Sequence, residues 1–277
     1  MIGIIGQGFV GNAVYQKFKN YYDVLTYDLD ESKSNSNVNE IICNCTNIFV
    51  CLPTPMNEDG SCNISIVEQV LAGIDLTTDN LETERNIIIK STIPPGTTAK
   101  WNRRFESLNI VFNPEFLTEA NAVSDYENQD RIILGGVRPA TTELKTIFSK
   151  VFPKAHIIKT DSTHAEMVKY LTNSFLATKV SFANEMYQIC EGLDVDYDKV
   201  IEYATQDERL GDSHWNVPGP DGDFGYGGHC FPKDVKALMV VAEDMDIIPL
   251  MLAATDVKNN EVRKNRDWEQ MKGRAVT

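Results

Sequence analysis

The chain has little positive charge. It carries 26 Lys and Arg residues against 40 Asp and Glu residues, which gives a formal net charge of −14 at pH 7. Attraction to the phosphates of a nucleic acid or to an anionic membrane is therefore not expected. An anionic substrate would need a local cluster of Lys and Arg side chains.

Long apolar runs and paired cysteines are also absent. No run approaches the about 18 apolar residues that indicate a transmembrane helix. The chain begins directly in an apolar strand pattern, so we expect no signal peptide and a cytoplasmic location. Six cysteines do not suggest a disulfide framework in a chain of 277 residues. Those at positions 43, 45, 51 and 62 lack paired zinc-like spacing and a nearby histidine, so no metal site is expected.

A glycine motif follows the first apolar run. Residues 2–5 lead into Gly6-x-Gly8-x-x-Gly11. Three glycines at this spacing allow a tight turn, close approach of a pyrophosphate, and packing of a helix on a sheet. The helix that starts here, with Phe9 and Val10 in its first turn, supplies amides for the phosphates. The motif predicts a dinucleotide site.

The second apolar run, residues 24–27, ends at an acidic residue. Asp28 lies twenty residues after Gly8, where a carboxylate can hydrogen-bond the ribose hydroxyls of an adenosine. Asp30 is a rival for this contact but lies further from the strand end. No arginine follows to bind a 2′-phosphate, so the pattern predicts NAD rather than NADP.

Strands and helices alternate through the first half, which predicts an α/β domain over 1–160 with a Rossmann-type doubly wound parallel sheet. Further strands are predicted at 47–51, 86–90, 109–112, 131–135 and 156–158, and helices at 64–74, 96–105 and 140–151. Ligands bind at the carboxyl ends of such strands. Three segments that follow strands, 53–55, 91–96 and 113–119, are therefore candidates for one rim. Residues 32–39 are expected to form a polar surface loop.

The second half, 161–277, is predicted to be an all-helical domain that begins with a long spine helix. Thr163-x-x-Glu166 indicates a capping box at its start, and the pattern continues towards Leu193. Its apolar stripe consists of Val168, Leu171, Phe175, Phe182, Met186 and Ile189. Helices are also predicted over 196–205, over 234–244 and beyond 248. A loop as long as 206–230 is usually functional.

The end of that loop sets a cysteine between a glycine turn and a helix start, in the run Phe224 to Asp234. Gly227 and Gly228 allow unusual backbone angles and close approach of a ligand, and Pro232 suits a first helical turn. A thiol just before a helix N-terminus is favoured as thiolate. The pattern predicts Cys230 as a nucleophile, although an isolated cysteine is more often simply buried.

Five motifs in order resemble the nucleotide-sugar dehydrogenases, the UDP-glucose and GDP-mannose dehydrogenase family. They are Gly6-x-Gly8-x-x-Gly11, Lys90-Ser91-Thr92-Ile93-Pro94, Asn113-Pro114-Glu115-Phe116-Leu117-x-Glu119, Lys169-x-x-x-Asn173-x-x-x-Ala177 and Gly227-Gly228-x-Cys230-x-Pro232-Lys233-Asp234. The resemblance implies NAD-dependent oxidation of the primary alcohol of a nucleotide sugar to the uronic acid. The aldehyde is captured on Cys230 as a thiohemiacetal, oxidised to a thioester and hydrolysed.

The resemblance also implies roles for the motif residues. Lys169 and Asn173 would stabilise an oxyanion, and Asp234 would position or deprotonate a water that Thr92 holds. Glu119 would act as acid/base in hydrolysis of the thioester. Thr54 and Thr92 are expected to join the glycine motif and Asp28 in binding NAD. Substrate contacts are expected from Glu115, Phe116, Leu117, Lys169, Asn173, Arg209, Phe224, Tyr226, Gly227 and Lys233. In the family this arginine can come from a neighbouring subunit.

Family members normally continue into a further nucleotide-binding-like domain that these residues do not include. The chain could be a compact dehydrogenase, one part of a split enzyme completed by a separate chain, or a cofactor-binding subunit without turnover. Another alternative is a beta-hydroxyacid dehydrogenase, which would use Lys169 and need no cysteine. We also expect a symmetric homodimer through the long helix and the helical second half.

Overall fold

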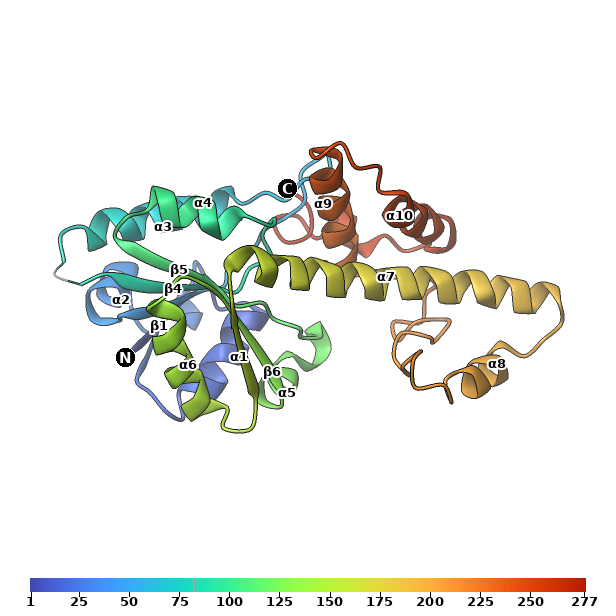
Figure 1. Cartoon of the computed structure of the whole chain (residues 1–277), viewed down its shortest axis with the longest axis horizontal. Coiled ribbons are helices and arrows are strands. Elements are labelled where there is room, and N and C mark those ends of the chain that lie inside the picture. The colour runs from blue at the N-terminus through green and yellow to red at the C-terminus, as the bar shows by residue number, and fades with distance from the viewer. Residues whose placement is uncertain (82) are drawn as a thin grey trace. The chain divides into compact units, whose positions relative to one another are not determined.

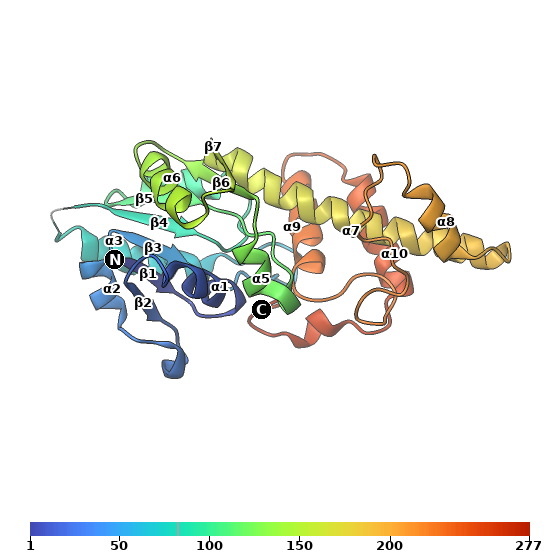
Figure 2. The ribbon, with the colours of Figure 1, turned by 90° about the horizontal axis from the view of Figure 1, so that it is seen from below.

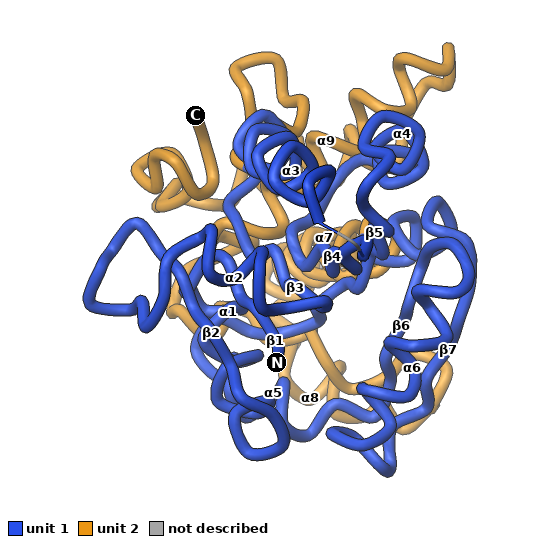
Figure 3. The backbone as a smooth tube through the Cα atoms, turned by 90° about the vertical axis from the view of Figure 1, so that its left-hand side faces the viewer, with its two compact units in different colours: residues 1–54, 64–169 blue, residues 55–63, 170–277 orange. Residues whose placement is uncertain are grey.

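The computed structural model describes residues 1–81 and 83–277. The chain divides into two compact units, here unit 1 (residues 1–54 and 64–169) and unit 2 (residues 55–63 and 170–277) (Figure 3). The division falls within the long helix α7 (Ser162–Gly192) rather than at the predicted 160/161. Residues 55–63, which the sequence placed in the first domain, belong to unit 2.

Unit 1 contains a seven-stranded sheet (Figure 1), and its strands run in the order β2-β1-β3-β4-β5-β6-β7 (Figure 3). The strands are β1 (Ile2–Ile5), β2 (Val24–Tyr27), β3 (Asn47–Val50), β4 (Arg85–Ile89), β5 (Leu108–Phe112), β6 (Arg131–Gly136) and β7 (His156–Thr160). The strand order reverses between β1 and β3, which is where ligands bind in open α/β sheets. The Rossmann-type fold is confirmed.

One strand pair departs from the predicted parallel sheet. β5 and β6 are antiparallel, whereas the other neighbours are parallel. Parallel neighbours need a crossover, usually a helix packed over the sheet. The connection between β5 and β6 holds a 3₁₀ turn and the short helix α5 (Ala122–Glu127), which packs beside α1 (Phe9–Phe18) instead (Figure 2). β6 therefore returns in the opposite direction.

Helices cover both faces of the sheet, and alternate strand residues point to opposite faces. Ile87 joins a buried cluster with α2 (Val38–Asn44), α3 (Ser65–Thr78) and α4 (Thr97–Arg104). Its neighbour Ile88 joins a second cluster with α1, α5 and α6 (Ala140–Val151). β4 is buried along its whole length, so a continuous apolar run marks a central strand here.

The surface loop predicted at 32–39 is confirmed for residues 34–37 but wrong at both ends. A 3₁₀ turn, η1 (Glu31–Lys33), is followed by the first residues of α2. The Asn37 side chain accepts from the Glu40 N–H at 2.9 Å, and the Glu40 carboxylate accepts from the Asn37 N–H at 3.5 Å, which forms a capping box. α2 buries only Ile41 and Ile42. A helix this short shows too little periodicity to be recognised.

The predicted capping box at the start of α7 is also wrong. The Asp161 carboxylate, not the Thr163 hydroxyl, accepts from a first-turn amide, the N–H of His164, at 3.0 Å. The buried Glu166 carboxylate accepts from the Gly96 and Thr98 N–H groups at 2.6 and 2.8 Å. Glu166 therefore caps α4, about 70 residues away in the chain. Local sequence cannot show a cap of this kind.

Unit 2 is helical, as predicted. It holds the rest of α7, then α8 (Tyr197–Ala204), α9 (Phe231–Glu243), α10 (Leu250–Val262) and the 3₁₀ turn η3 (Asp267–Gln270). Met56 pairs with both Cys62 and Val276, so the last residues of the chain lie beside the 55–63 segment. In the described part of the chain, no helix combines the length and hydropathy needed to cross a membrane.

Candidate functional site

The glycine motif forms a tight turn after β1. Gly6 has a φ of +93°, and a Cβ on it would lie 2.4 Å from the Cys51 carbonyl oxygen. A Cβ on Gly11 would lie 1.8 Å from the Gly6 carbonyl oxygen, whereas one on Gly8 would meet nothing within 4 Å. The first and third glycines are therefore required by packing, and the second leaves room for a ligand. α1 begins directly after it, at Phe9.

The acid after β2 is fixed against this turn. One Asp28 oxygen accepts from the Gln7 N–H at 2.6 Å and the other from the Asp30 N–H at 2.9 Å. Asp30 itself caps η1 through Ser32 and is exposed. Of the two rivals, Asp28 is thus the one held beside the glycine turn.

The segments that follow β3 and β4 are joined at the carboxyl edge of the sheet. The Thr54 hydroxyl donates to the Thr92 carbonyl at 2.7 Å, and both residues are buried. Ser91 exchanges two hydrogen bonds with the backbone of Leu52, at 3.0 and 2.6 Å. Thr54 and Thr92 therefore lie together at this edge of the sheet. Their contact with the cofactor stays a prediction.

A buried ion pair lies after β5. The Lys169 ammonium is 2.8 Å from Glu115 Oε1 and also donates to the Glu115 carbonyl at 2.7 Å. These side chains are only 3% and 10% exposed. Burial raises the pKa of Glu115, but Lys169 and the Leu117 N–H outweigh it, so the net pKa lies below its ordinary value. Glu115 is therefore a carboxylate at neutral pH.

A second buried lysine lies near this pair. Lys90 donates to Asn113 Oδ1 at 2.9 Å, and its ammonium lies 5.4 Å from the centre of the Tyr126 ring. Burial lowers the pKa of Lys90 to about 8. The sequence singled out the motif that contains Lys90 but gave this side chain no role.

In unit 2 a polar cluster is buried at the start of α9. Asn173 donates to Asp234 Oδ2 at 2.6 Å, and the Lys233 ammonium is 2.5 Å from Asp234 Oδ1. Each of these residues is at most 5% exposed. Burial lowers the pKa of Lys233, but the charges of Asp234, Cys62 and Cys230 raise it by more, so Lys233 is an ammonium.

Cys230 is the N-cap residue of α9 and is half-buried. Its carbonyl accepts from the Asp234 N–H at 2.9 Å, the first bond of the helix. The Cys230 thiol is close enough to Lys233 to raise the pKa of the lysine. By contrast, burial raises the pKa of Cys45, and it raises that of Cys51 to about 12. The position of Cys230 at a helix N-terminus, as predicted, is favourable for a thiolate.

Both units match one family. Residues 33–155 match the NAD binding domain, and residues 163–261 the central domain, of the UDP-glucose/GDP-mannose dehydrogenase family. A UDP-glucose 6-dehydrogenase of Haloferax volcanii is 30% identical over 311 residues, which cover 96% of this chain and 71% of that protein. The chain belongs to this family.

Two further relatives agree. A UDP-glucose 6-dehydrogenase of Rickettsia bellii is 32% identical over 257 residues, which cover 90% of this chain and 57% of that protein. The solved UDP-glucose dehydrogenase of Pyrobaculum islandicum superimposes with a TM-score of 0.85 at 26% identity, over 94% of this chain and 68% of that one. The chain thus spans 57% to 71% of the length of these three dehydrogenases.

NAD is the cofactor of this family member. The open space beside Gly8 and the Asp28 carboxylate at the end of β2 fit a dinucleotide. Among the described residues, the buried Gln7 Nε2 lacks a hydrogen-bond partner, which leaves a donor at the turn. These residues would hold the adenosine and pyrophosphate of NAD.

Glu119, predicted as an acid/base, and two predicted substrate residues, Tyr226 and Arg209, have different surroundings in the structure. Glu119 is exposed on η2 (Glu119–Asn121), and the carboxylate that contacts Lys169 is that of Glu115. The Tyr226 side chain is buried in a cluster with Ala177 and Val235. Arg209 is exposed and pairs with Asp207 at 2.9 Å.

Three other predicted substrate residues, Phe116, Leu117 and Phe224, are partly buried. Phe116 and Leu117 pack at the edges of the two sheet clusters, and the Phe116 ring centre lies 5.5 Å from the Lys169 ammonium. Phe224 packs on Tyr187, with ring centres 5.6 Å apart. Sequence reasoning missed Asn184, Asn259 and Asp267, which accept hydrogen bonds from backbone N–H groups just after Phe224. It also missed Arg263, which pairs with Asp267. Their only sequence signal is the spacing of Asn259 and Arg263, one helical turn apart.

Proposed function

We propose that this chain oxidises the primary alcohol of a nucleotide sugar to the uronic acid, as a UDP-glucose 6-dehydrogenase does. The observation that carries the proposal is the start of α9. There a half-buried cysteine, Cys230, precedes a buried Lys233–Asp234–Asn173 cluster. A simple alcohol dehydrogenase needs no such cysteine.

The four-electron oxidation proceeds in two hydride transfers. When bound, NAD accepts one hydride in each oxidation. The Cys230 thiolate attacks the carbon of the intermediate aldehyde, a C–S bond forms, and the carbonyl electron pair moves to oxygen. Loss of the second hydride from this thiohemiacetal leaves a thioester. Water then adds to the thioester carbon, the C–S bond breaks, and the thiolate returns with release of the carboxylate.

The buried ions suit the remaining steps. Lys169 is proposed to stabilise an oxyanion at the reacting carbon. Glu115 is the better candidate for acid/base work than Glu119, because Glu115 contacts Lys169 and Glu119 is exposed. Asp234, which accepts a hydrogen bond from the Asn173 side-chain amide, is proposed to orient the attacking water. Thr92 is proposed to hold the same water.

A cytoplasmic homodimer is part of the proposal. Leu171, Phe175 and Phe182 on α7 are 62%, 64% and 50% exposed. Large apolar side chains that are at least half exposed along one helix indicate an interaction surface. Light scattering at micromolar concentration should show a dimer, and Phe175→Glu should shift it towards the monomer. A wild-type monomer would contradict this part, and a dimer that survives Phe175→Glu would exclude this stripe as its interface.

The alternatives make different predictions. A beta-hydroxyacid-type dehydrogenase would depend on Lys169 and not on Cys230. A cofactor-binding subunit, or one part of a split enzyme, would bind NAD yet turn over slowly or only with a separate chain. Addition of that chain would restore turnover.

Replacement of Cys230 tests the proposal. Cys230→Ser should still reduce NAD in the first oxidation but form no acid, because serine without an adjacent base is a poor nucleophile. Cys43→Ser is the matched control, since Cys43 is an exposed cysteine of unit 1. The purified variants would be supplied with UDP-glucose, GDP-mannose and N-acetylated UDP-sugars, and the products identified by mass spectrometry. Acid formation by Cys230→Ser at the wild-type rate would refute the proposed mechanism.

A further inference from the structure

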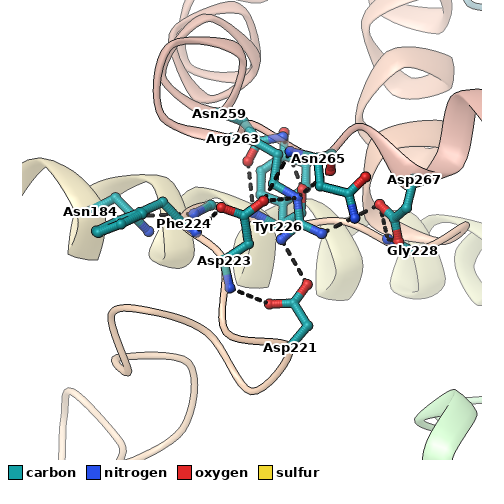
Figure 4. Close-up of polar contacts among 11 residues, drawn as sticks. Asn184, Asp221, Asp223, Phe224, Tyr226, Gly228, Asn259, Arg263, Asn265 and Asp267 are labelled. Atoms are coloured by element: carbon teal, nitrogen blue, oxygen red, sulfur yellow. Dashed lines mark hydrogen bonds and ion pairs between the residues drawn. The ribbon is translucent and has the colours of Figure 1, made fainter.

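The guanidinium of Arg263 is buried at the end of α10 among three carboxylates (Figure 4). Its side chain is 1% exposed. Nη1 lies 2.7 Å from Asp221 Oδ2, an ion pair without hydrogen-bond geometry. Nε lies 3.6 Å from Asp223 Oδ2, and Nη2 lies 3.4 Å from Asp267 Oδ1. Nε also donates to the Asn265 carbonyl at 2.7 Å.

Side chains around Arg263 hold the backbone of the glycine-rich segment, residues 224–228. Asp223 accepts from the Phe224 N–H at 2.8 Å, and Asp267 accepts from the Gly228 N–H at 3.1 Å. Asn259, one turn before Arg263 on α10, accepts from the Tyr226 N–H at 2.7 Å and donates to the Tyr226 carbonyl at 3.1 Å. Asn184 on α7 accepts from the Gly225 N–H at 3.1 Å.

Two of the three glycines of the segment are required by this contact. A Cβ on Gly227 would lie 2.2 Å from Arg263 Nη2 and 2.5 Å from Asp267 Oδ1. A Cβ on Gly225 would lie 2.3 Å from Asn259 Oδ1. The backbone therefore lies directly against the guanidinium and its neighbours, and no side chain fits between them.

We infer that Arg263 is a positioning residue, which fixes the glycine-rich segment and through it the start of α9 at Cys230. Two of its carboxylate partners, Asp223 and Asp267, each accept a backbone N–H of the segment. Without the central cation, three carboxylates would repel one another and release these amides. The segment ends two residues before Cys230, so greater motion of its backbone would also leave the position of the Cys230 thiol less well fixed. The expected fall in kcat rests on the proposed function, whereas the expected rise in hydrogen exchange of the segment does not.

Arg263→Gln tests the inference, with Arg266→Gln as the matched control. Arg266 lies three residues away, is 43% exposed, and pairs with Glu269 at 3.3 Å, so its loss removes the same charge from the surface. The readout is hydrogen exchange of peptides that cover 224–230, together with kcat and the KM for NAD. In Arg263→Gln, exchange at Phe224, Tyr226 and Gly228 should rise about tenfold or more. kcat should fall by a similar factor, with the KM for NAD unchanged.

Exchange in unit 1 separates positioning from general loss of stability. Peptides from β4 should exchange equally in wild type, Arg263→Gln and Arg266→Gln. Arg263→Lys, which keeps the charge but not the planar fork, should recover part of the protection of the segment and part of kcat. If Arg263→Gln does not fold, the same exchange measurement is made on Asp267→Asn. This variant keeps an acceptor for the Gly228 N–H and removes one ion pair of Arg263.

The outcomes are distinct. Unchanged exchange over 224–230 in a folded Arg263→Gln, or in Asp267→Asn where that variant decides, overturns the inference. Faster exchange with kcat unchanged also overturns it, because the segment would then be held for stability alone. A wild type that oxidises no nucleotide sugar refutes the proposed function, and the exchange result then decides separately whether Arg263 fixes the segment.

Discussion

Lys169→Met would leave the buried Glu115 carboxylate without the cation that contacts it. The ammonium and carboxylate are 2.8 Å apart, with side chains 3% and 10% exposed, so water cannot replace the lost partner. Removal of one member of a buried pair costs about 3–5 kcal/mol, a large share of the about 5–15 kcal/mol that stabilises a typical domain. With an m-value of about 2–3 kcal/mol/M in urea, the unfolding midpoint should fall by about 1–2 M.

A double-mutant cycle identifies the cause of this loss. Glu115→Gln removes the negative charge, so the double variant Lys169→Met/Glu115→Gln should recover about 2 kcal/mol or more of the deficit. Lys159→Met is the control, since Lys159 is exposed and donates to Thr142 Oγ1 at 3.0 Å. It should change stability by at most about 0.5 kcal/mol.

The pH dependence gives the same test a second readout. The pKa of Glu115 is lowered in the folded protein, so the pair contributes stability above the ordinary glutamate pKa, and this contribution is lost as the pH falls through the folded value. The deficit of Lys169→Met should therefore narrow in acid. A deficit no larger than that of Lys159→Met at neutral pH would refute the buried pair.

Three further predictions concern single groups. Asp28→Ala should weaken NAD binding about 10- to 150-fold in calorimetry, the loss of one charge-assisted hydrogen bond; tighter binding of NADP than of NAD would contradict the assignment. Iodoacetamide near neutral pH should label Cys230 before Cys45 and Cys51, because burial raises the pKa of both others; mapping that finds Cys230 slowest would refute its nucleophilic role. Lys90, whose pKa falls from 10.5 to about 8, binds fewer protons when folded than when unfolded between these values. Its contribution to stability should therefore rise by roughly 3 kcal/mol from pH 8 to 10.5 relative to Lys90→Met in urea unfolding, and a constant difference would refute this.

Local patterns predicted the parts of this fold that depend on neighbours in sequence. The glycine motif, the buried strands and the start of α9 at Cys230 are set by residues a few positions apart. α6 begins and ends at the predicted residues, Ala140 and Val151. The direction of β6 was missed, because it depends on where α5 packs.

The long helix shows why the site was harder to predict than the fold. The apolar side chains of Leu171, Phe175 and Phe182 are exposed, whereas polar side chains such as Glu166 and Asn173 are buried. Both of these polar side chains have partners about 60 to 70 residues away in the chain. A periodic pattern shows the face of a helix but not its partners. The same holds for Arg263, whose three carboxylates lie on two separate segments.

The central claim is that Cys230 captures the aldehyde that the first oxidation forms, so that the same substrate molecule is oxidised a second time. The most direct measurement is the number of NADH formed per nucleotide sugar consumed by the purified chain, with the product identified by mass spectrometry. The account predicts two NADH and a carboxylic acid. One NADH per substrate, with an aldehyde or ketone as the final product, would contradict it.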